Sequence, residues 1–151
     1  MQNQLQFDLR QRLDECLHTL LVRNAGPWPL ERAQKCFLRI LSDRRGAARA
    51  MPITDIVGVM RLDDHKVDAR SVKQIAADLT VCFKVPIGAS RVQPYGYFLI
   101  ETLDELQSTS QIYAHEIQKL AQRYRALNGA SAVSSLFGQL ELELAKEPEH
   151  V

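Results

Sequence analysis

The residues from Pro52 to Ile100 predict two short helices followed directly by a β-hairpin. In the second helical run, apolar residues recur at spacings of three and four, which gives the helix one buried stripe. The members of this stripe are Val72, Ile75, Ala76, Leu79 and Cys82. The hairpin run that follows has β-branched or aromatic residues on both arms and turn residues between them. The elements follow in the order helix, turn, helix and hairpin. Because the apolar stripe takes up one side of the second helix, the polar side of that helix is available for contact.

Two runs of this region carry a resemblance: ARSVKQIAADL at 69–79 and VPIGASRVQPYGYFL at 85–99. They resemble the winged-helix domain of bacterial and prophage regulators, including biotin-repressor-like domains, in which a recognition helix precedes a hairpin called the wing. The resemblance covers about a third of the chain. It implies a mainly α fold with a small β-hairpin wing, a winged helix-turn-helix flanked by N- and C-terminal helices. The expected segments are 1–28, 29–100 and 101–151.

The flanking segments show helical periodicity of their own. Residues 4–23 have a leucine-rich stripe that ends before Gly26 and Pro27, and residues 30–42 predict the scaffold helix that precedes the helix-turn-helix. Thr54 and Asp68 are the expected N-caps of the two helices that follow, because their side-chain oxygens can accept from exposed backbone N–H groups.

Residues 101–127 predict one long helix with Thr102 as its N-cap. Apolar residues follow a heptad spacing along it, and a helix of this length is longer than a small winged-helix core needs. We expect either the N-terminal helix or the same helix of a second subunit to cover this seam. The expected homodimer interface is Leu106, Tyr113, Ile117, Leu120 and Tyr124. A helix is expected at 131–146, and the final polar residues are expected to be disordered.

Charge is balanced over the whole chain but unevenly distributed. The net charge is +1, which by itself does not favour nucleic-acid binding. Residues 44–100 nevertheless carry nine basic and five acidic side chains, whereas residues 101–151 carry four and eight. The positive charge therefore lies on the segment that contains the predicted recognition helix and wing.

The sequence indicates no metal site, cofactor or enzymatic motif. The three cysteines lie far apart and suit core thiols, and the histidines are scattered, so no zinc cluster is expected. His65 is expected in a solvated turn. Phosphate-binding loops, nucleophile elbows and metalloprotease motifs are absent from the sequence. Without these motifs, we expect that the protein is not an enzyme. The N-terminus lacks the apolar run of a signal peptide and no stretch is long enough to span a membrane, which predicts a cytoplasmic protein.

The sequence therefore predicts a dimeric regulator that binds double-stranded DNA. Arginine suits guanine and glutamine suits adenine, so the expected base-reading residues are Arg70, Lys73 and Gln74. The expected DNA-backbone contacts are Arg44, Arg45, Ser71, Lys84 and Arg91. For each cation taken singly, a solvated surface charge explains it equally well. Two alternatives stay open: a winged-helix interaction module without DNA binding, and a small-molecule sensor, for which Ser110 with Tyr113 is the only hint.

Overall fold

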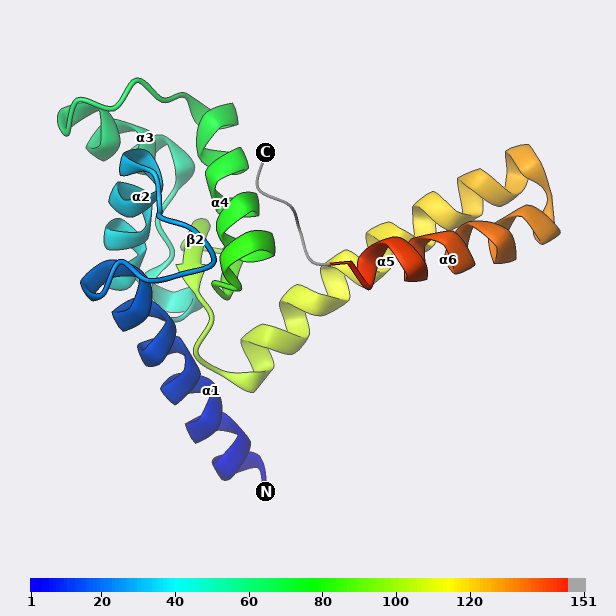
Figure 1. Ribbon diagram of the computed structural model, residues 1–151, viewed down its shortest axis with the longest axis horizontal. Helices are drawn as coiled ribbons and strands as arrows, with labels where there is room; N and C mark the ends of the chain where they lie inside the picture. Colours follow the sequence, from blue (N-terminus) through cyan, green and yellow to red (C-terminus); the bar gives the residue numbers. More distant parts are fainter. Residues whose placement is uncertain (147–151) are drawn as a thin grey trace. The chain divides into compact units, whose positions relative to one another are not determined.

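The computed structural model describes residues 1–146, which form six α-helices and one two-stranded antiparallel sheet (Figure 1). The predicted mainly α fold with a small hairpin is confirmed. The elements are α1 (Gln2–Leu17), a π-helical turn (His18–Val22), α2 (Arg32–Ser42), a 3-10 turn (Ala47–Arg49), α3 (Ile53–Leu62), α4 (Ala69–Phe83), β1 (Ile87–Ser90), β2 (Gly96–Leu99), α5 (Leu103–Asn128) and α6 (Ala130–Leu144).

The chain divides into two compact units. Met1–Gln107 form the first, and the described residues from Ser108 onward form the second. The first unit therefore contains α1 to α4 together with β1 and β2, and the boundary falls inside α5. The second unit is a helical hairpin in which α6 runs back along the second half of α5 (Figure 1).

The core of the first unit is built from one face of each of its helices. Phe37, Leu38 and Leu41 of α2 are fully buried, and α3 and α4 contribute their own apolar stripes. The N-terminal helix belongs to this core, because its last turns insert Leu13 and Leu17 among these residues. The stripe predicted on α4 is confirmed: Val72, Ala76 and Leu79 are buried, and Ile75 and Cys82 are half-buried against the same cluster.

The hairpin is held against the segment that joins α2 to α3. Strands β1 and β2 pair in the register Ile87↔Leu99 to Ser90↔Gly96. The free edge of β2 pairs with the joining segment at two places, Arg45↔Leu99 and Met51↔Tyr97. The Met51 and Tyr97 backbones exchange both hydrogen bonds, each 2.9 Å long. The joining segment thus fixes the hairpin to the helical scaffold.

Side-chain oxygens cap the N-termini of α4 and α5. Asp68 caps α4 as predicted, because its Oδ1 accepts from the Ser71 N–H at 2.7 Å. Thr102 Oγ1 likewise accepts from the Glu105 N–H at the start of α5, at 3.2 Å. The prediction of Thr54 as the N-cap of α3 was wrong: Pro52 holds that position and makes no side-chain cap. Proline suits a helix start, since its fixed φ is preset for helix entry.

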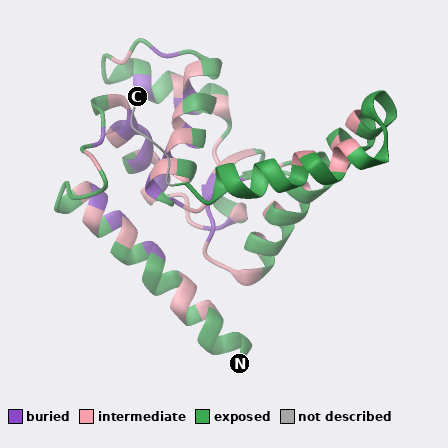
Figure 2. Ribbon diagram, turned by 45° about the vertical axis from the view of Figure 1, so that its right-hand side comes forward, coloured by how far each residue is buried: buried purple, intermediate pink, exposed green. Residues whose placement is uncertain are grey.

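The second unit buries no side chain completely. Neither α5 nor α6 contains a buried residue, and Figure 2 shows the hairpin almost wholly in the colour of exposed residues. Its half-buried residues include Ala121 and Tyr124 on α5 and Val133 and Leu136 on α6. The prediction of a disordered C-terminal tail falls largely on residues 147–151, which lie outside the described residues.

Within residues 1–146, every helix is too short or too polar to serve as a transmembrane span.

Candidate nucleic-acid interface

The exposed face of α4 carries the residues predicted to read bases. Arg70, Lys73 and Gln74 are all exposed, on the side of the helix opposite its buried stripe. The same face continues through Ala77 and Val81, which are exposed as well. At about 100° per residue, these five side chains share one face of the helix, about 100° wide. Sequence reasoning missed Ala77 and Val81, although extending the periodicity beyond Gln74 would have found them.

Gln74 is held in place by its neighbour one turn along. Its side-chain Nε2 donates to Asp78 Oδ1 at 2.8 Å. An amide nitrogen has two N–H groups, so this bond leaves the second N–H and the carbonyl oxygen of Gln74 for another partner. Asp78 is half-buried, and its negative charge is directed along the helix toward Gln74.

Ser71 lies inside the cap of α4. Its hydroxyl donates to Asp68 Oδ1 at 2.8 Å, and the side chain is half-buried. The Ser71 hydroxyl therefore has a structural role in the helix cap. The sequence instead predicted that it contacts the DNA backbone. The backbone hydrogen bond from Ser71, followed by the hydroxyl bond, lowers the pKa of Asp68 from 3.8.

This lowered pKa predicts a pH effect on stability. Because the folded pKa of Asp68 is below the unfolded one, the cap stabilises fully above the unfolded pKa of about 3.9. Its contribution disappears as the pH falls through the folded pKa. Asp68→Asn keeps a capping oxygen but cannot titrate. We expect the Tm of the wild type relative to Asp68→Asn to stay constant above about pH 5 and to fall below about pH 4, measured by circular dichroism. A Tm difference that stays constant across this range would contradict the prediction.

The cations predicted to contact the DNA backbone lie in three different places. Lys84 is exposed and follows α4 with a left-handed backbone, φ 59°. Arg91 is exposed in the loop between β1 and β2. Arg44 and Arg45 are half-buried in the segment that pairs with β2. Arg45 Nη1 donates to Asp14 Oδ1 of α1 at 2.5 Å, so its charge is already paired within the chain.

The residues predicted for a dimer interface are accessible on the hairpin of α5 and α6. Tyr113, Ile117 and Leu120 are 55–62% exposed, Leu106 is exposed to 38%, and Tyr124 is half-buried. Ser110 and Tyr113, the hint of a small-molecule site, are both exposed. The predicted seam therefore remains available for contact in the single chain.

One sequence prediction about a turn was wrong. His65, expected to be solvated, has a side chain only 8% exposed, because the turn between α3 and α4 folds against α2. It lies beside Asp63 and Cys36. Burial, followed by a hydrogen bond to the Asp63 carboxylate, raises the pKa of the Cys36 thiol.

Comparisons with known proteins returned no relative of the chain. No protein-family model matches the sequence, and neither the curated proteins nor the solved structures that were compared include a match.

Proposed function

We propose that the chain is a DNA-binding transcriptional regulator of the winged-helix type that acts as a dimer. The observation that carries this proposal is the exposed face of Arg70, Lys73 and Gln74 on α4, the second of two consecutive helices joined by a short turn. A basic and amide-bearing line of this kind matches the donor and acceptor groups of a major groove. The hairpin that follows α4 supplies the wing.

The surroundings of α4 support this use. Pairing of β2 with the segment after α2 ties the hairpin to the helical scaffold that also carries α4. Ala77 follows the three polar residues on the same face, and its small side chain lets the helix backbone approach a groove closely. A methyl group there also suits contact with a thymine methyl.

Each polar residue has a defined task in this proposal. Arg70 donates in bidentate fashion to guanine O6 and N7, and Gln74 pairs with adenine through the N–H and carbonyl that its bond to Asp78 leaves available. Lys73 lies beside both and favours the same guanine acceptors. Lys84, Arg44 and Arg91 contact phosphates, which set the register on the duplex without reading sequence. Arg45 contributes less, because Asp14 already pairs with it.

A salt titration tests DNA binding directly. With three phosphate contacts per chain, log K should fall against log salt with a slope of about −2.7, from about −0.9 for each contact. Raising the salt from about 50 to about 200 mM should then weaken binding about 40-fold per chain. Fluorescence anisotropy with a pool of labelled random-sequence duplexes measures this. A wild type that binds no duplex at the lower salt would refute the proposal.

Two alanine variants separate base reading from phosphate contact. Arg70→Ala should lose about 1–3 kcal/mol on a preferred site selected from the pool, and should relax preference at one base pair. Lys84→Ala should instead weaken binding equally on all sequences and make the salt slope shallower by about one unit. Both residues are exposed, so neither change should lower the Tm. Equal behaviour of the two variants on all duplexes would contradict a reading role for Arg70.

The second candidate function is an interaction module without DNA binding. The exposed apolar residues of α5 and α6 favour it, since contiguous apolar surface marks contact with another protein. This candidate function does not explain the exposed polar face of α4. Failure of duplex binding together with retained self-association would select it over the regulator.

A further inference from the structure

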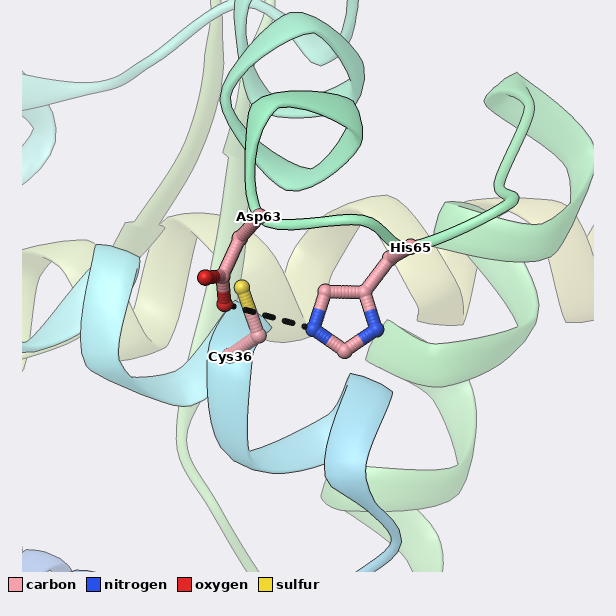
Figure 3. A group of neighbouring side chains, drawn as sticks. All are labelled: Cys36, Asp63 and His65. Atoms are coloured by element: carbon pink, nitrogen blue, oxygen red, sulfur yellow. Dashed lines mark ion pairs between the residues drawn. The ribbon is translucent and has the colours of Figure 1, made fainter.

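Three side chains with metal-binding chemistry meet between α2 and the turn that follows α3. Cys36 comes from the middle of α2, and Asp63 and His65 come from the turn (Figure 3). One potential ligand atom from each, the Cys36 Sγ, an Asp63 carboxylate oxygen and a His65 ring nitrogen, lies within 4.8 Å of the other two. Figure 3 shows all three side chains directed toward a common point.

His65 gives an independent indication of a ligand. Its side chain is 8% exposed, and its Nε2 is buried and makes no hydrogen bond among the described residues, although it lies within ion-pair distance of the Asp63 carboxylate (Figure 3). A buried polar atom without a partner is uncommon and costs free energy, so each such atom in a native fold calls for an explanation. This nitrogen is directed toward Asp63 and Cys36, where a bound cation would supply the partner (Figure 3).

The spacing fits a tetrahedral ion. His65 Nε2 lies 3.4 Å from Asp63 Oδ2, longer than most hydrogen bonds in proteins. With Zn–N and Zn–O bonds of about 2.1 Å, a tetrahedral angle separates the two ligand atoms by about 3.4 Å. A sulfur ligand at about 2.3 Å from zinc would lie about 3.6 Å from the nitrogen, and the Cys36 Sγ lies within 4.8 Å of both other ligand atoms.

The backbone of the turn is fixed before any ion binds. The Asp63 N–H donates to the Met60 carbonyl at 3.2 Å, and the His65 N–H donates to the same carbonyl at 3.0 Å. Arg61 Nε donates to the Val67 carbonyl at 2.9 Å and closes the turn from the other side. Asp63 keeps 66% of its side chain exposed, which leaves an entry path from solvent.

We propose that Cys36, Asp63 and His65 form a binding site for a thiophilic divalent cation of the Zn²⁺ type. A cysteine, a histidine and a carboxylate are ligand types that Zn²⁺ takes, and three protein ligands leave a fourth position for water. Binding releases the thiol proton of Cys36 to solvent, because the thiolate is the ligand. The ion would join α2 to the turn between α3 and α4. This site does not depend on DNA binding.

Cobalt titration of the full-length chain, stripped of metal by a chelator, tests the site. We expect one equivalent of Co²⁺ to produce a thiolate-to-cobalt charge-transfer band and the intense visible bands of a four-coordinate ion. Zn²⁺ should displace it and raise the Tm. Asp63→Asn should weaken Co²⁺ binding on the order of 100-fold or more, beyond what outer partners of a metal site contribute. Its metal-free Tm should stay within a few degrees of the wild type.

Matched cysteine variants complete the test. Cys36→Ser should abolish the charge-transfer band, whereas Cys82→Ser, which changes a half-buried thiol elsewhere in the core, should retain it. Because Cys36 is buried and its variant can lose stability, Asp63→Asn provides the second independent readout. A wild type without a band at millimolar Co²⁺ would overturn the proposal. So would a band that survives Asp63→Asn at full affinity, or one that depends on Cys82.

Discussion

Gly96→Ala should destabilise the first unit by about 3–5 kcal/mol, the range reached only by substitutions with a specific structural cause. Gly96 begins β2 with φ +120°, a backbone conformation that residues with a side chain rarely adopt. A Cβ atom there would approach the Met51 carbonyl carbon to 2.2 Å and the Pro52 nitrogen to 2.5 Å. These neighbours are backbone atoms, so no side-chain rotation relieves the clash.

The damage should extend beyond the hairpin. Met51 and Tyr97 exchange two backbone hydrogen bonds next to Gly96, and these bonds connect the hairpin to the segment between α2 and α3. Moving the backbones apart would break that connection and shift Tyr97, whose ring packs edge-on against Phe37 with centroids 6.0 Å apart. Urea unfolding followed by circular dichroism measures the loss of free energy of unfolding.

Gly58→Ala is the matched control. Gly58 lies in α3, and a Cβ atom added there meets nothing within 4 Å. Alanine should therefore stabilise the chain by about 1 kcal/mol through helix propensity. Opposite signs for the two glycine substitutions would support the close approach at Gly96. A Gly96→Ala protein as stable as the wild type would show that the hairpin does not contact the α2–α3 segment as described.

Local periodicity predicted the helices of this chain well. The stripe on α4, the cap at Asp68 and the long helix α5 depend on residues a few positions apart, so their signals lie in short stretches of sequence. The exposed face with Arg70 and Gln74 follows from the same periodicity, because the residues left outside the stripe must face away from the core.

Contacts between distant segments were not predictable in this way. The pairing of Arg45 and Met51 with β2 uses backbone groups, which every residue type provides, so no residue pattern announces it. The ion pair of Arg45 with Asp14 and the burial of His65 against α2 likewise depend on how helices pack. For these reasons, the sequence predicted Arg45 among the DNA-backbone contacts although Asp14 pairs with it, and it predicted a solvated turn where three potential metal ligands meet.

The hairpin of α5 and α6 leaves apolar side chains exposed that a partner would cover. Two helices in water gain little from propensity alone, and most helical stability comes from packing an apolar face. Here no side chain is fully buried, while Ile117, Leu120 and Phe137 remain more than 40% exposed. A second copy of the hairpin would complete a four-helix bundle and bury these faces.

The charges of the hairpin fit a second copy in antiparallel orientation. Near the closed end, α5 carries Lys119, Arg123 and Arg125, whereas near the open end α6 carries Glu141 and Glu143. Lys146 pairs with Glu143, which leaves the open end less acidic than the sequence count suggests. In an antiparallel pair of hairpins, the basic end of one lies against the acidic end of the other.

Ile117→Asp combined with Leu120→Asp should abolish self-association. Burying two carboxylates per chain in an apolar contact costs at least about 4 kcal/mol per dimer, and this raises the Kd about 1,000-fold. Both residues are more than half exposed in the single chain, so the monomer should keep its fold. Sedimentation equilibrium of the full-length chain should give twice the chain mass for the wild type and the chain mass for the variant.

Gln111→Asp combined with Gln118→Asp is the control for this experiment. It adds the same charge and the same low helix propensity to α5, but on exposed positions outside the heptad seam. We expect this control to remain dimeric, and its far-ultraviolet circular dichroism to match that of the first variant. Equal dissociation of both variants would assign the effect to charge or to helix loss. If the wild type sediments as a monomer at high micromolar concentration, a second copy of the chain does not cover the apolar face of α5 and α6.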